Sequence, residues 1–210
     1  MDRKRLTQRF PFLLPMRRAQ RKMCFYAGMR FDGCRYADKD TPYKDGLTVT
    51  NGKLTTMSGG GMCQMSNLLF WMFLHTPLTI IQRRGHEVKE FPEPNSDEIK
   101  GVDATISEGW IDLKVRNDTD CTYQIWVTLD DEKIIGQVSA DKEPQALYKI
   151  TNGSIQYVRE SGGIYEYAQV KRMQVALGTG EIIDCKLLYT NKCKICYPLP
   201  ESVDIQEENQ

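Results

Sequence analysis

A chain of 210 residues is long enough for one sizeable domain, and 40% hydrophobic with 27% charged residues excludes global disorder. Its 28 basic and 28 acidic residues cancel, and nucleic-acid binding would rest on one N-terminal basic segment alone, so no nucleic-acid partner is expected. No stretch reaches the roughly 20 apolar residues that span a bilayer, and no signal peptide is evident, so we expect a cytoplasmic protein.

The N-terminal segment is strongly basic. Residues 1–22 carry eight basic side chains against a single acid, Asp2. From Leu6 to Tyr26 the pattern favours one or two helical stretches, interrupted by prolines, so we predict a basic helical arm over residues 1–37. Such an arm could contact an anionic membrane surface, at the inner face of the membrane. Alternatively, it is a solvated helix face or an arm that packs on the domain.

The middle of the chain predicts a buried helix. Leu47–Thr50 looks like a strand between turn signals, and three glycines, Gly59 to Gly61, precede an almost wholly apolar run from Met62 to His75. A helix that is apolar on every side is buried on every side, and Pro77 ends it.

Consecutive strand-like runs follow the helix. They are 78–82, 86–91, 103–107, 110–116, 123–129, 134–138, 154–158, 169–177, 181–188 and 193–197. A single helix followed by consecutive antiparallel strands predicts an α+β fold, with a central buried helix packed on a mostly antiparallel sheet. We assign this domain to residues 38–200 and predict a flexible acidic tail over residues 201–210.

The seven cysteines are odd in number and show no compact disulfide framework, so reduced thiols are expected. Cys193 and Cys196 have zinc-ligand spacing, but a second Cys/His pair is missing. The sequence therefore predicts neither a metal nor a cofactor.

Cys63 is the strongest candidate for chemistry. At a helix start the dipole favours the thiolate, which is the reactive form of cysteine. His86, on the next strand, would serve as general base and Asp103 would orient its ring, whereas His75 lies too far along the helix to reach Cys63. The order resembles that of papain-like and transglutaminase-like enzymes. The alternative is a small packed cysteine with no catalytic role.

The residues around Cys63 would serve the substrate. Gln64 and the amides of the glycine loop could donate hydrogen bonds to an oxyanion. Gly59, Gly60 and Gly61 would let a substrate backbone approach closely, and we assign Ser66 to substrate binding with them.

The glycine segment also resembles a known family. Ser58–Leu68, Arg84–His86, Gly101–Thr105 and Asp112–Asp120 are similar to the VanW family, with glycines, cysteine and glutamine at fixed spacing. The resemblance implies an association with vancomycin (glycopeptide) resistance and the Gram-positive cell envelope, and no assigned activity. One departure is that Ala37 runs directly into Asp38, where family members carry a longer stretch.

Two hypotheses remain open. The first is a cysteine-dependent hydrolase or transferase that acts on an amide or peptide bond of a cell-wall precursor. The second is a non-enzymatic protein that binds such a precursor, the membrane surface or partners from a resistance cluster. They differ at Cys63, because an enzyme needs its sulfur and a binding module should tolerate serine.

Overall fold

The structure is a computed structural model that describes residues 12–13, 20–25, 30–32, 45–50, 53–92, 99–107, 109–129 and 133–208. Within these residues it contains strands β1 to β14 and one helix, α1. The prediction of an α+β fold with a papain-like arrangement is wrong, because the protein is mostly β and its longest elements form a curled mixed sheet.

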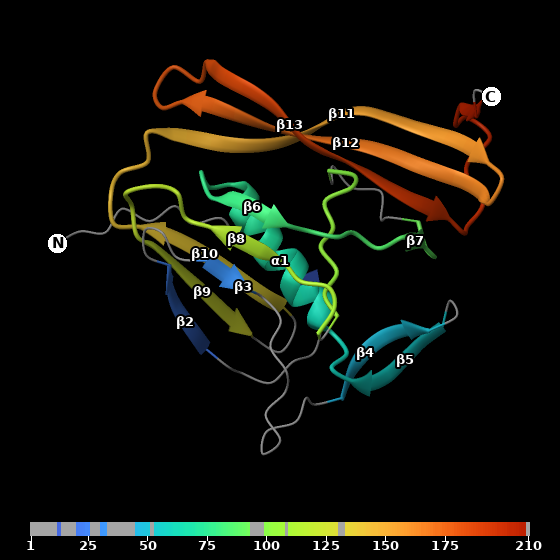
Figure 1. Cartoon of the computed structure of the whole chain (residues 1–210), viewed down its shortest axis with the longest axis horizontal. Helices are drawn as coiled ribbons and strands as arrows, with labels where there is room; N and C mark the ends of the chain where they lie inside the picture. The colour runs from blue at the N-terminus through green and yellow to red at the C-terminus, as the bar shows by residue number, and fades with distance from the viewer. Residues whose placement is uncertain are drawn as a thin grey trace.

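The largest sheet has the order β14-β11-β12-β13-β7. Its three long antiparallel strands are β11 (Ala146–Glu160), β12 (Gly163–Ala176) and β13 (Ile182–Ile195). Two short strands, β14 (Ile205–Glu207) and β7 (Val88–Lys89), pair in parallel at its edges. Figure 1 shows the long strands lying across the top of the molecule, above α1.

A second sheet has the order β1-β10-β9-β2. Its strands are β1 (Phe12–Leu13), β10 (Lys133–Ala140), β9 (Tyr123–Leu129) and β2 (Gln20–Phe25). The helical stretches predicted between Leu6 and Tyr26 are therefore strands at the described residues, and the rest of that segment lies outside them. The predicted consecutive strands 123–129 and 134–138 are confirmed as β9 and β10, which pair antiparallel.

Two smaller units complete the fold. One is a sheet of β3 (Arg30–Asp32), β8 (Lys114–Arg116) and β6 (Thr79–Gln82), and the other is the hairpin of β4 (Asp45–Thr50) with β5 (Lys53–Ser58). The acidic tail predicted to be flexible over residues 201–210 contains a strand, because Ile205 to Glu207 pair with β11. In the described part of the chain, no helix has the length and apolar character needed to cross a membrane.

Helix α1 (Met62–Leu74) lies at the centre of the core. Its most buried side chains are Leu68, Phe70, Met72, Phe73 and Leu74, while Leu69 and Trp71 are partly buried against the same cluster. The prediction of a helix without an exposed apolar face is confirmed. At Gly136 in β10, an added Cβ would lie 2.3 Å from Met72 Sδ, so this glycine lets the sheet approach the helix.

Candidate functional site

The three glycines before α1 are explained by the protein's own backbone. Gly59 and Gly61 have φ angles of 79° and 86°, which side chains disfavour. At Gly60 an added Cβ would lie 2.0 Å from the carbonyl oxygen of Gly46 in β4. The glycines are therefore needed to turn the chain into the helix beside the β4–β5 hairpin, and this accounts for them without any substrate contact.

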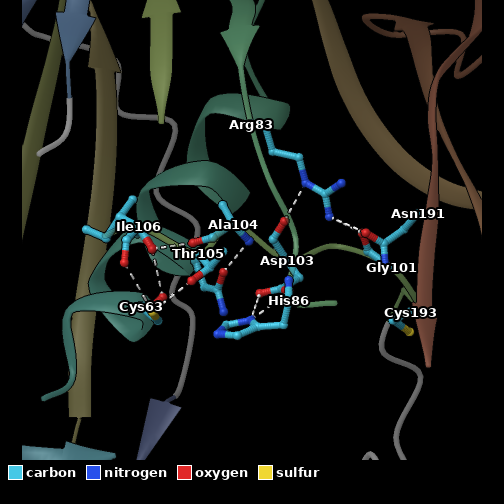
Figure 2. Close-up of polar contacts among 12 residues, drawn as sticks. Cys63, Arg83, His86, Gly101, Asp103, Ala104, Thr105, Ile106, Asn191 and Cys193 are labelled. Carbon is cyan, nitrogen blue, oxygen red and sulfur yellow. Dashed lines mark hydrogen bonds and ion pairs between the residues drawn. The ribbon is translucent and has the colours of Figure 1, made fainter. Parts of the chain in front are cut away.

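Cys63 lies in the first turn of α1, facing the extended segment of residues 103–106. Its Sγ is 3.2 Å from Thr105 Oγ1 and 3.9 Å from the carbonyl oxygen of Ile106 (Figure 2). The residue is only partly buried.

His86 and Asp103 form the ion pair expected from the sequence. His86 Nδ1 lies 2.8 and 3.0 Å from the two carboxylate oxygens of Asp103, and the backbone N–H of His86 donates to Asp103 Oδ2 at 2.5 Å. With Nδ1 engaged, Nε2 is the ring nitrogen left for Cys63. Figure 2 shows the imidazole lying between Asp103 and the Cys63 side of the site.

The three groups change one another's acidity. Burial alone would raise the pKa of Cys63, but hydrogen bonds from His86 and Thr105 lower it from 9.0 to about 7. Hydrogen bonds to Asp103 and Cys63 raise the pKa of His86 from 6.5 to about 10. Burial raises the pKa of Asp103, but its hydrogen bonds and attraction to His86 bring it below 3.8. Between about pH 7 and about pH 10, these two pKa values place the proton on His86 and leave Cys63 as a thiolate.

Two side chains of α1 hold the segment that carries Asp103 and Thr105. Ser66 is buried and its hydroxyl donates to the carbonyl oxygens of Ala104 and, at 2.9 Å, of Cys63. Asn67 Oδ1 accepts the backbone N–H of Ala104 at 2.6 Å. Ser66, which the sequence assigns to substrate binding, is thus placed by the structure as an internal link between helix and segment.

Arg83 supports Asp103 from the other side. Its Nε donates to the carbonyl oxygen of Asp103 at 2.5 Å, and its Nη2 donates to the carbonyl of Gly101 at 3.2 Å and to Asn191 Oδ1 at 2.6 Å (Figure 2). The guanidinium lies 4.3 Å from the ring centre of Tyr189, which favours a cation–π contact. Arg83 therefore connects the site to β13.

A buried carboxylate anchors both chain segments of the site to β12. Glu166 is fully buried and accepts hydrogen bonds from Lys89 Nζ at 2.7 Å, Tyr157 Oη at 2.8 Å and Lys100 Nζ at 3.3 Å. Lys89 follows His86 by three residues and Lys100 precedes Asp103 by three. Because the carboxylate is paired, its burial is tolerated and it can restrain the two segments.

The predicted oxyanion donors are only partly available. The amides of Gly60, Met62 and Gln64 already donate to backbone carbonyls within the turn. The side-chain oxygen of Gln64 is buried and has no hydrogen-bond partner among the described residues. The N–H of Cys63 itself lies in the first turn, where amides lack helical acceptors, and is the better candidate donor.

The sequence interpretation missed Thr105, Arg83 and Asn67 as parts of the site. Asn67 and Thr105 lie within the segments Ser58–Leu68 and Gly101–Thr105, and Arg83 precedes Arg84–His86, but composition does not show which of these side chains point inward. The two cysteines with zinc-ligand spacing differ in burial: Cys193 is buried near Glu166, whereas Cys196 is exposed. Among the described residues, no group of three His, Cys, Asp or Glu side chains could hold a metal ion.

The lowered pKa of Cys63 predicts selective alkylation. Iodoacetamide should modify Cys63 with a rate that rises with pH and is half-maximal near pH 7, since only the thiolate reacts. Asp103→Asn should move this midpoint upward, because a less basic His86 stabilises the thiolate less. The rate is measured by peptide mass spectrometry, with the exposed Cys196 as internal comparison. A Cys63 midpoint at the free-thiol value of about 8.5 would contradict the pairing.

Comparisons with known proteins agree with this sequence pattern. The family described as "VanW like protein" matches residues 32–139, which include Cys63, His86 and Asp103. The chain is also 71% identical to the vancomycin B-type resistance protein VanW of Enterococcus faecalis (strain ATCC 700802 / V583), with 100% of both chains covered. That alignment spans 275 positions, so part of the relative has no counterpart in the 210 residues here. No solved structure matches. The chain belongs to the VanW family.

Proposed function

We propose that this protein contributes to vancomycin resistance as a cysteine-dependent enzyme that cleaves or transfers an amide or peptide bond of a cell-wall peptidoglycan precursor. The resistance role is supported by the name of the relative that shares 71% of its residues. The enzymatic role is supported by one observation above all: His86, whose ring is held by the Asp103 carboxylate, is close enough to Cys63 to help lower the pKa of its thiol to about 7.

The geometry suits nucleophilic attack on a carbonyl carbon. The Cys63 thiolate forms a C–S bond with that carbon, and the negative charge moves to the carbonyl oxygen. The Cys63 N–H, in the first turn of α1, would donate to this oxygen. Because the pKa of His86 is raised to about 10, the imidazole already carries the proton and first acts as a general acid, rather than as the general base predicted from the sequence.

The proton on His86 is then used to cleave the amide bond. When the tetrahedral intermediate collapses, the C–N bond breaks, His86 gives its proton to the leaving amine, and a thioester remains on Cys63. Neutral His86 next takes a proton from water or from an acceptor amine, which attacks the thioester. The acyl group leaves as an acid or a new amide, and the thiolate and imidazolium are restored.

The site is open enough for a polymeric substrate. The side chain of His86 is 49% exposed, whereas that of Asp103 is 22% exposed, so the ring is accessible while its anchor is protected. A peptide that runs over the start of α1 would meet Cys63 without crossing the core. This openness fits a peptide chain better than a small molecule that must be enclosed.

The two titrating groups predict the pH dependence of turnover. Activity needs a thiolate at Cys63 and a proton on His86, so kcat/KM should rise through about pH 7, stay level, and fall above about pH 10. The measurement follows synthetic peptidoglycan stem peptides by mass spectrometry across this range. A thermal melt at each pH separates inactivation from unfolding. A profile that rises only through about pH 8.5, as for a free thiol, would argue against the ion pair.

A further inference from the structure

The N-terminal half of β13 is an exposed apolar edge. Every residue from Ile182 to Leu187 is exposed, and Ile182, Ile183 and Leu187 are 61%, 56% and 47% exposed. On one side β13 pairs with β12, but on the other β7 reaches only Lys194 and Ile195. Figure 1 shows this half of β13 at the upper margin of the sheet, with no described strand beside it.

Such an edge favours pairing with another strand. An edge strand presents a row of backbone N–H and C=O groups that its own sheet leaves unpaired, and natural proteins usually protect these with charges, bulges or short strands. Here the charges are Asp184 and Lys186, and β13 has an extra residue at Ile183 and at Leu188 relative to β12. The stretch between these irregularities is Asp184–Leu187, so a partner strand can add only over this stretch and the residues that flank it.

We propose that the partner is a second copy of this chain, paired antiparallel along β13 about a two-fold axis at Cys185. In this register Asp184 of each copy lies opposite Lys186 of the other, and Ile183 lies opposite Leu187. The segment Ile183–Leu187 is thus complementary to itself in both charge and hydrophobicity. A self-complementary surface is what a two-fold dimer interface requires.

The charges also select this register over its neighbours. A slip of two residues in one direction brings Lys186 opposite Lys186, and a slip in the other direction brings Asp184 opposite Asp184. Like charges directly opposite each other destabilise an antiparallel pair, whereas opposite charges and apolar pairs stabilise it. Asp184 and Lys186, which would discourage unspecific pairing, therefore favour this one arrangement. In the dimer, the β12–β13 sheet continues through both copies.

The first test is the oligomeric state of the full chain, measured by sedimentation in reducing buffer over a concentration series. We expect a reversible monomer–dimer equilibrium. Ile183→Lys should weaken dimerisation by about tenfold or more, because a charge replaces an apolar contact at two symmetric places. The matched control is Ile155→Lys in β11, which changes an exposed isoleucine away from this edge and should leave the equilibrium unchanged.

Charge exchange separates pairing from any effect on folding. Lys186→Glu puts acids opposite each other at both symmetric positions and should weaken the dimer by about tenfold. Adding Asp184→Lys to this variant restores opposite charges and should restore dimerisation. A wild-type chain that stays monomeric at every concentration, or a double variant no stronger than the single one, would overturn the proposal.

Cross-linking tests the register directly. Opposed residues of antiparallel strands have Cα atoms about 4.5–5.5 Å apart, within the range a disulfide spans. Copper phenanthroline should therefore join the two Cys185 thiols, taking two electrons while two protons go to solvent. Cys185→Ser should abolish the covalent dimer and keep the reversible one, and Cys196→Ser should change neither. A covalent dimer that persists in Cys185→Ser would place the contact elsewhere.

Discussion

Replacing Cys63 by alanine should reduce turnover of stem peptides by at least about 10³-fold, because no other group of the site can form the acyl intermediate. His86→Ala should cost nearly as much, since the same residue lowers the pKa of Cys63 and supplies the proton. The double variant should be scarcely worse than either single one, because residues that act as a unit are strongly non-additive. Turnover is measured by mass spectrometry, and vancomycin susceptibility of a host carrying each variant gives the second readout.

Asp103→Asn and Cys63→Ser sharpen this test. An amide at residue 103 can still accept the backbone N–H of His86, so we expect an intermediate loss of activity with the fold kept. Cys63→Ser places a hydroxyl near Thr105 in place of the thiolate, so an enzyme fails while a binding protein continues to work. Cys196→Ala, an exposed cysteine, is the control. Full resistance in folded Cys63→Ser would return the protein to the non-enzymatic class.

The sequence could predict that Cys63, His86 and Asp103 come together because the signals were local. Glycines before an apolar run mark a helix start, and this places Cys63 in the first turn. His86 and Asp103 do meet, although the strand predicted for residues 103–107 is an extended segment with only a single bridge, from Ser107 to Ile111. Its backbone is held by side chains of α1 and by Arg84, whose carbonyl accepts the Thr105 N–H at 2.8 Å. A sequence that alternates apolar and polar residues does not show whether the segment pairs in a sheet or is held by side chains.

The fold class could not be read from local patterns. The runs 181–188 and 193–197 predict two strands, yet β13 continues through the polar pair Asn191 and Lys192 because β12 pairs with it along its length. Asn191 is buried and accepts a hydrogen bond from Arg83, a partner 108 residues away. Tertiary pairing overrides the local preference in such cases, so the length of the β structure was underestimated.

The internal contacts of Ser66 and the glycines could not be predicted, for a related reason. Small residues beside a reactive cysteine suit a substrate, but they suit close backbone packing equally well. Gly60 faces Gly46, which is distant from the helix start in sequence, and Ser66 faces Ala104. Only the positions of those partners distinguish a contact within the protein from a contact with a ligand.

The largest loss of stability is expected at Phe70. This side chain of α1 is fully buried. Its ring centre lies 6.1 Å from that of Tyr189 in β13 and 5.8 Å from the guanidinium carbon of Arg83. Phe70→Ala removes the ring from a packed core, so the free energy of unfolding should fall by about 3–5 kcal/mol. Denaturant titration measures this as a lower midpoint with an unchanged slope.

A matched variant shows whether burial is the cause. Phe91→Ala makes the same chemical change at a side chain that is 52% exposed, and should alter the free energy of unfolding by no more than about 0.5 kcal/mol. Phe70 also supports Arg83, which holds the carbonyl of Asp103. The alkylation midpoint of Cys63 should therefore rise in Phe70→Ala and stay unchanged in Phe91→Ala. Equal losses of stability in the two variants would mean that the core around α1 is not packed as the structure shows.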